Sequence, residues 1–221
     1  MARRRSPSTP RVAPVELSGL ADAGPDDLGA GVLLDGVRLA GLDLPPTQLA
    51  GAELVEVVLD AVTADDLDLS GARLREVLLS GVRFTSLRAS HGSWQDTQVS
   101  GRLGVLDAQA ARWRSVMLTG CKIDLLSLRD ATVDDLLLAD CQIGELDLSG
   151  ARLTRVRLSA TQVGTVEVHG LRSDHLDLRG ASIDRFVNLE ALRGAMVTPA
   201  QVTWWASALA EALGLRVVAD E

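Results

Sequence analysis

The residues best suited to catalysis or metal binding are few and scattered in this sequence. It has two cysteines, Cys121 and Cys141, and three histidines, His91, His169 and His175. A structural zinc site needs about four nitrogen or sulfur ligands close together, and an activated nucleophile needs a base and an orienting group beside it. No such grouping is visible along the chain. The sequence therefore predicts no catalytic residue, no metal or cofactor site and no enzyme activity.

The elements that position these residues are set by an internal repeat. An aliphatic or other apolar residue recurs at nearly every fifth position from Leu34 to Ile183, and the register slips once, between Val99 and Leu103. A longer period of 20 is also present, because Leu-Asp-Leu-Ser-Gly-Ala-Arg-Leu at 67–74 has equivalents at 20-residue intervals and returns unchanged at 146–153. Repeats of this kind must be identified first, since they determine the whole fold.

A period of five within a period of twenty predicts a coil with four sides, each side being one pentad. Each pentad directs two side chains inward, and coils must stack to bury them. Stacked strands are about 4.8 Å apart, so the roughly seven coils between residues 37 and 183 give a rod about 35 Å long. In this arrangement Cys121 and Cys141 stack as small buried hydrophobes, and Trp94 stacks on Trp113 beside the slip.

Three pentads carry a recognisable family pattern: Ala52-Glu-Leu-Val-Glu56, Ala72-Arg-Leu-Arg-Glu76 and Ala151-Arg-Leu-Thr-Arg155. They resemble the Ala-(Asp or Asn)-Leu-x-x motif of the pentapeptide-repeat family, although arginine often replaces the acidic or amide residue. The resemblance covers about two-thirds of the chain and implies an all-β fold, a right-handed quadrilateral parallel β-helix. A leucine-rich repeat also has a period near 20, but it would not show four equivalent pentads.

Both ends differ in composition from the repeat. Prolines and glycines predict a flexible tail over residues 1–30, the β-helix spans 31–190, and 191–221 form a C-terminal helix and cap. Thr198-Pro199 fits a helix start and Gly214 a helix end. The apolar face of that helix comprises Val202, Trp205, Ala206, Leu209 and Leu213, and Trp204 points away from it. The resemblance, not the spacing, implies a homodimer through this helix.

One predicted outward column contains an apolar stripe of Val58, Leu78, Met117 and Leu137 on both sides of Gln98. A contiguous exposed apolar patch is unusual on a monomer and indicates a contact site. We therefore predict these four residues and Trp204 as an interface with an unidentified protein partner. The other interpretations are tolerated surface aliphatics, or cover by the N-terminal segment around residues 12–34.

Another side is acidic. Its predicted outward and corner positions carry Asp65, Asp66, Asp68, Asp107, Asp124, Glu145, Asp147 and Glu167, next to a side with an arginine column. Some family members bind DNA gyrase as mimics of duplex DNA and protect against quinolones, so the resemblance implies a possible type II topoisomerase partner. Residues 37–183 hold 20 acidic and 15 basic residues, whereas duplex DNA of that length carries about 20 negative charges. Solvated, mutually neutralising faces are the simpler interpretation.

Composition sets the remaining limits. The net charge of -8 argues against direct binding of nucleic acid, and no apolar run approaches the roughly 20 residues of a membrane span. The basic start of the chain lacks the apolar segment of a secretory signal. The expectation is a cytoplasmic, non-catalytic interaction or scaffold protein, with a DNA mimic as the alternative.

Overall fold

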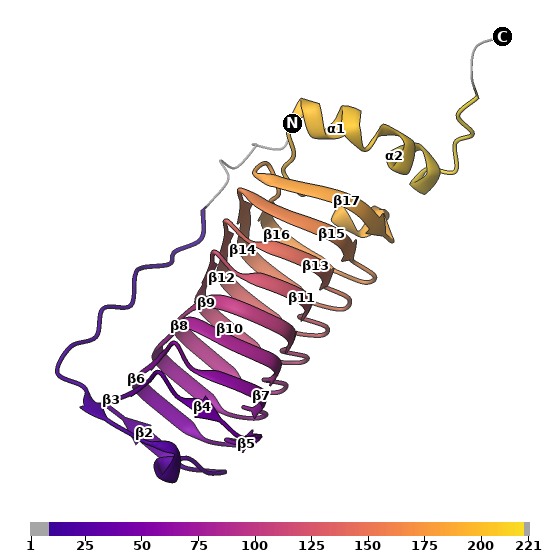
Figure 1. The fold of residues 1–221 in the computed structure, drawn as a ribbon. Helices are drawn as coiled ribbons and strands as arrows, with labels where there is room; N and C mark the ends of the chain where they lie inside the picture. Colours follow the sequence, from indigo (N-terminus) through magenta and orange to yellow (C-terminus); the bar gives the residue numbers. More distant parts are fainter. Residues whose placement is uncertain (1–8, 219–221) are drawn as a thin grey trace.

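The computed structural model describes residues 9–218, and most of them form one coil of parallel β-strands. Its 17-stranded sheet winds around four sides for about eight turns (Figure 1). Strand partners in successive turns are 20 residues apart over most of the rod, as between Trp113 and Val133. The predicted class, a four-sided parallel β-helix, is confirmed. The coil has about eight turns, whereas the sequence estimate for residues 37–183 was about seven.

The strands follow the four sides of the coil. The N-terminal end has β1 (Ala21–Asp22) and the 3-10 helix η1 (Pro25–Asp27). Two adjacent sides are formed by β2 (Leu33–Asp35), β3 (Val37–Ala40), β6 (Glu53–Asp60), β8 (Arg73–Arg88), β9 (Ser93–Asp107), β10 (Arg112–Thr119), β12 (Thr132–Ala139), β14 (Arg152–Ser159) and β16 (Arg172–Asp177). The other two sides are formed by the later parts of β8 and β9 and by β4 (Asp43–Leu44), β5 (Thr47–Gln48), β7 (Thr63–Asp68), β11 (Lys122–Ser127), β13 (Gln142–Asp147), β15 (Thr161–Glu167) and β17 (Ala181–Val187).

Each pentad places one outward side chain at the centre of a side, where it stacks on its equivalents in neighbouring turns. We name the four faces by these columns. Face A carries Glu53, Arg73, Ser93, Arg112, Thr132, Arg152 and Arg172; face B carries Arg38, Val58, Leu78, Gln98, Met117, Leu137 and Arg157. Face C carries Asp43, Thr63, Arg83, Arg102, Lys122, Gln142 and Gln162; face D carries Asp68, Arg88, Asp107, Ser127, Asp147 and Glu167.

The interior of the rod is aliphatic, as the five-residue period predicts. The inward residues of the pentads form one continuous core, in which Leu54, Val57 and Leu59 are representative of a single turn. Cys121 and Cys141 are free and buried at the same inward position of adjacent turns. Trp94 and Trp113 stack with ring centroids 5.0 Å apart and an interplanar angle of 15°. The predicted core positions and both predicted stacks are confirmed.

The slip in the repeat is accommodated at one corner. Strand β9 is paired with β8 in register up to Val99 opposite Leu79, and pairing resumes with Gly101 opposite Val82. Gly101 has a φ of +135°, and a Cβ on it would lie 2.1 Å from the Val82 carbonyl oxygen. Only glycine fits such a backbone. The turn is therefore one residue shorter at this corner, while the inward residues on both sides keep their places.

The C-terminal cap consists of two short helices instead of the single helix that the sequence predicts. Helix α1 is Pro199–Trp204 and α2 is Ala206–Ala212, after the 3-10 helix η2 (Leu189–Leu192). Thr198 caps α1 by accepting a hydrogen bond from the Gln201 N–H, as predicted. The Thr198 N–H donates in return to Gln201 Oε1, and Gln201 Nε2 donates to the carbonyls of Leu178 and Ala181, at 2.7 and 2.8 Å. The cap thus satisfies backbone groups at the open edge of the last turn.

The apolar face predicted for this cap is only partly correct. Trp205 is buried, donates from its indole N–H to the Ile183 carbonyl at 3.1 Å, and meets Phe186 edge to face. Val202 and Leu213 are exposed, because the helix is interrupted at Trp205 and the two helices do not share one apolar face. Within residues 9–218 no helix is both long and apolar enough to cross a membrane.

Candidate functional site

An N-terminal arm, residues 9–20, lies along face B of the rod (Figure 1). The Arg11 N–H donates to Asp135 Oδ1 at 2.8 Å, and Gln98 Nε2 donates to the Ala13 carbonyl at 3.2 Å. These contacts join residues 124 and 85 positions apart. The tail predicted over residues 1–30 is therefore seated on the β-helix from residue 9 onward, while residues 1–8 lie outside the described part of the chain.

The apolar stripe on face B lies beside this arm. Val58 is only 9% exposed, and Leu78, Met117 and Leu137 are half-buried, although all four point outward from the coil. The expectation of an exposed patch is therefore wrong. Of the interpretations that the sequence left open, cover by the N-terminal segment agrees with the position of Leu17 and Leu20, which line one space together with Val58 and Leu78. The role of the stripe as an interface with another protein stays a prediction, and it requires the arm to leave.

Asp135 is the polar anchor of the arm. Its carboxylate accepts hydrogen bonds from Arg155 Nε and Nη2, at 2.6 and 2.7 Å, as well as from the Arg11 N–H. Burial alone would raise the pKa of Asp135, but the hydrogen bonds from Arg155 and Arg11 outweigh burial and hold it below its usual value. The carboxylate is therefore ionised at neutral pH. The sequence held a signal for this pair that was not used, because Asp135 and Arg155 are 20 residues apart and therefore occupy equivalent positions in successive turns.

The acidic side comprises face D and its corner with face C. Several of its carboxylates form hydrogen bonds with nearby groups of the coil. The carboxylates of Asp68, Asp107 and Asp147 each accept the N–H of the residue two positions further on, at 2.8 to 3.0 Å. This Asx geometry stabilises a turn. The sequence signal for such an Asx turn is an aspartate two residues before a corner, as in Asp-Leu-Ser. These three side chains therefore shape corners of the coil.

Ion pairs neutralise part of the same face. Arg88 pairs with Asp66 at 2.8 Å and lies 3.5 Å from Asp68, and Arg129 pairs with Asp147 at 2.7 Å. Burial would raise the pKa of Asp147, but hydrogen bonds from Ser149 and Arg129 more than compensate and lower it. The remaining predicted acidic residues are Asp65, Asp124, Glu145 and Glu167, and Asp65 accepts a hydrogen bond from Thr85. The structure thus leaves fewer available carboxylates than the sequence suggested.

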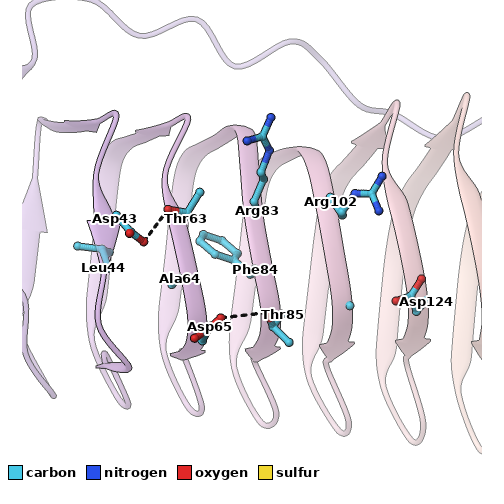
Figure 2. A pocket seen from close by; sticks show the side chains of 11 residues that line it. Asp43, Leu44, Thr63, Ala64, Asp65, Arg83, Phe84, Thr85, Arg102 and Asp124 are labelled. Carbon is cyan, nitrogen blue, oxygen red and sulfur yellow. Dashed lines mark hydrogen bonds between the residues drawn. The ribbon is translucent and has the colours of Figure 1, made fainter.

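A shallow groove of about 530 Å³ runs along face C (Figure 2). Arg83 and Arg102 form one wall, and Asp65 and Asp124 lie on the other side, with Gly104 between them. The two aspartates are three turns apart, or about 14 Å, whereas paired catalytic carboxylates lie within about 5–9.5 Å of each other. Asp65 and Asp124 are therefore too far apart to act as a catalytic carboxylate pair.

The two cysteines of the chain lie in the core of the coil. The Cys121 and Cys141 thiols are buried, and hydrogen bonding to Cys141 together with burial raises the pKa of Cys121. A cysteine with a raised pKa is a poor nucleophile. Within residues 9–218, no three His, Cys, Asp or Glu side chains form a group that could hold a metal ion.

Most of the exposed large apolar side chains of the described residues lie at or near the C-terminal cap. Seven of the eight exposed large apolar side chains described in the chain fall there, and they are Val187, Val202, Trp204, Leu213, Leu215, Val217 and Val218. Trp204 is 78% exposed and borders an apolar hollow between α1 and the last turn. The position of Trp204 outside the packed face was predicted from the sequence and is confirmed.

One family model and several solved structures match parts of this chain. A family model described as pentapeptide repeats (8 copies) matches residues 46–81, and no curated protein matches the sequence significantly. Matching solved structures include a trypsin-treated form of QnrB1, a plasmid-mediated fluoroquinolone resistance protein, at 16% identity and a TM-score of 0.37, covering 86% of this chain and 100% of that one. Another is HetL, a pentapeptide-repeat protein involved in heterocyst differentiation regulation from the cyanobacterium Nostoc sp. strain PCC 7120, at 18% identity and a TM-score of 0.23, covering 76% and 90%. Residues 46–81 therefore resemble pentapeptide repeats, in agreement with the five-residue sides of the coil.

Proposed function

We propose that this protein is a non-catalytic interaction module that forms a homodimer through its C-terminal cap. The observation that carries the proposal is the concentration of exposed apolar side chains at one end of the rod, around Trp204. Contiguous exposed apolar surface marks contact sites, and tryptophan is enriched among residues that dominate binding energy. The proposal places the protein in the cytoplasm, where the free Cys121 and Cys141 would remain reduced.

The surface around Trp204 has the features that a symmetric contact needs. A two-fold interface uses the same patch on both subunits, so the patch must complement itself. Here a protruding indole lies beside a hollow of about 330 Å³, which is lined by Ile183, Ala200, Gln201 and Trp205 among others. The Trp204 side chain of one subunit could therefore enter the hollow of its partner. Both the protrusion and the hollow belong to one subunit and need no rearrangement of the coil.

Replacing Trp204 with glutamate is expected to convert a dimer into a monomer. A charged group placed in an apolar contact would lose its hydration without a partner. The molar mass in solution can be measured by light scattering after size exclusion. Leu33→Glu is the matched control, since Leu33 is also exposed, at 63%, but lies at the opposite end of the rod. A monomeric unsubstituted protein, or a dimeric Trp204→Glu variant, would refute the proposed dimer.

The alternative function is a DNA mimic that binds a type II topoisomerase. The observation that favours it is a row of carboxylates at the corner of faces C and D, of which Asp124 and Glu145 are exposed and take part in no ion pair among the described residues. Against it, Asp66, Asp68 and Asp147 are paired with arginines. The homodimer module remains the function we favour.

A gyrase supercoiling assay tests this alternative directly. We expect no inhibition by micromolar protein, because the neutralised face lacks the charge density of duplex DNA. The informative variant pair is Asp124→Lys with Glu145→Lys, which reverses the unpaired charges without touching the Asx turns. Inhibition by the natural sequence that disappears in this double variant would establish the mimic and replace the expectation stated here.

A further inference from the structure

The contact between the arm and face B shows what kind of ligand that face accepts. The arm is extended, and Val12, Val15, Leu17 and Leu20 are half-buried, whereas the residues between them are mostly exposed. These side chains lie along the face that carries the apolar stripe. Leu17 and Leu20 line one space together with Val58 and Leu78. Face B therefore accommodates an extended segment that presents aliphatic side chains at intervals of two or three residues.

The polar contacts of the arm involve only its backbone. Asp135 accepts a main-chain N–H, and the Gln98 amide donates to a main-chain carbonyl. Any extended polypeptide supplies both groups, so these anchors recognise a conformation and not a particular side chain. Arg155 holds the Asp135 carboxylate with two hydrogen bonds of its own. The anchor is therefore in place whether or not the arm is bound.

The arm is attached more weakly than a strand of the coil. It crosses the strands of face B, and within the described residues only the two hydrogen bonds above join residues 9–20 to the rod. An open space of about 440 Å³ separates part of the arm from face B. Gly19 has a positive φ of 72° and free space around it, so the chain can change direction there. Residues 9–18 can thus move away while β1 stays paired with β3.

We propose that face B is a docking groove for an extended segment of a partner protein, and that the arm is an internal competitor for this groove. The partner segment has the chemistry of the arm, with aliphatic side chains at the spacing of Val12, Val15, Leu17 and Leu20 and free backbone groups opposite Asp135 and Gln98. This inference rests on the proposed interaction function and names the class of partner. It assigns the stripe and the arm a shared role.

The arm sets the affinity of the groove for its partner. A tethered competitor acts at an effective concentration in the millimolar range. The apparent affinity for a partner falls by the fraction of time for which the groove is open. A substitution that loosens the arm without altering the groove must therefore strengthen partner binding, whereas a surface with no docking role would bind nothing in either state.

A fluorescently labelled synthetic peptide with the sequence of residues 9–20 is the probe, and its binding to the full-length chain is measured by polarisation. In the double variant Val15→Asp with Leu17→Asp, two half-buried arm side chains become charged, so the arm should detach. We expect this variant to bind the peptide at least about tenfold more tightly than the natural sequence. Adding Leu78→Asp and Leu137→Asp in the groove should abolish this gain.

A matched control carries the same added charge on the exposed side of the arm. Ala13→Asp with Ser18→Asp places two carboxylates at exposed positions, so peptide affinity should stay at the natural level. Equal peptide binding by the natural and arm-loosened chains would overturn the proposal, and so would binding that survives the two groove substitutions. Loss of the homodimer in Trp204→Glu would leave the peptide result unaffected, so failure of the dimer and failure of the docking groove can be told apart.

Discussion

Replacing Gly101 with alanine is expected to destabilise the rod by more than about 4 kcal/mol, an unusually large effect for one methyl group. The added Cβ would lie 2.1 Å from the Val82 carbonyl oxygen and 2.7 Å from the Val82 nitrogen, and both belong to backbone that cannot move aside. The φ of +135° is also unfavourable for alanine. The urea midpoint, followed by circular dichroism, should fall sharply or the chain should fail to fold.

Gly120 provides the matched control. It occupies the same corner in the next turn, with a φ of +61° and no atom within 4 Å of an added Cβ. Ala61 and Ala160 already take this left-handed conformation at equivalent corners. Gly120→Ala should therefore cost only about 1 kcal/mol. If both variants unfold at the same urea concentration, the shortened corner is not the constraint that the structure indicates.

Replacing Trp94 with alanine is expected to lower the free energy of unfolding by about 4 kcal/mol. Trp94 is fully buried and stacks on Trp113, so its removal leaves a cavity in an otherwise aliphatic core and removes an aromatic contact. The effect should appear as a lower urea midpoint. An unchanged midpoint would show that the core collapses around the missing ring.

Trp94→Phe separates packing from hydrogen bonding at the same position. The indole N–H groups of Trp94 and Trp113 are buried without a partner among the described residues, and such a group is unfavourable. Phenylalanine keeps an aromatic ring and removes the unpaired N–H, so it should cost less than half as much as alanine. A loss as large as that of Trp94→Ala would contradict this account.

The coil itself could be predicted because its contacts repeat. Leu54 meets Leu74, and Trp94 meets Trp113, at intervals that appear directly as a period in the sequence. Even the slip was visible, since one missing residue shifts every later apolar position. The cap was harder to predict. Val202 and Leu213 fit the periodicity of one long helix, but packing of Trp205 against the last turn interrupts it.

The availability of side chains could not be predicted from the period. The sequence carries a signal for the corner turns of Asp68 and Asp147, but it does not show that Asp147 also pairs with Arg129. Arg129 belongs to the turn before that of Asp147 and lies at a corner, so no regular interval connects the two. The acidic face therefore looked more charged than it is.

The sequence alone determined the four-sided coil, its inward residues and the stacking of the cysteines and tryptophans. Residues that contact each other in neighbouring turns are about 20 positions apart. Because the inward ones must pack together, apolar residues recur in the sequence at that interval. Only the tertiary structure decided that the arm lies on face B and that Arg129 pairs with Asp147. The arm reaches the rod through contacts such as Arg11 with Asp135, 124 residues apart. A contact that occurs only once leaves no periodic signal in the sequence. It can be recognised only when the positions of both surfaces in the folded chain are known.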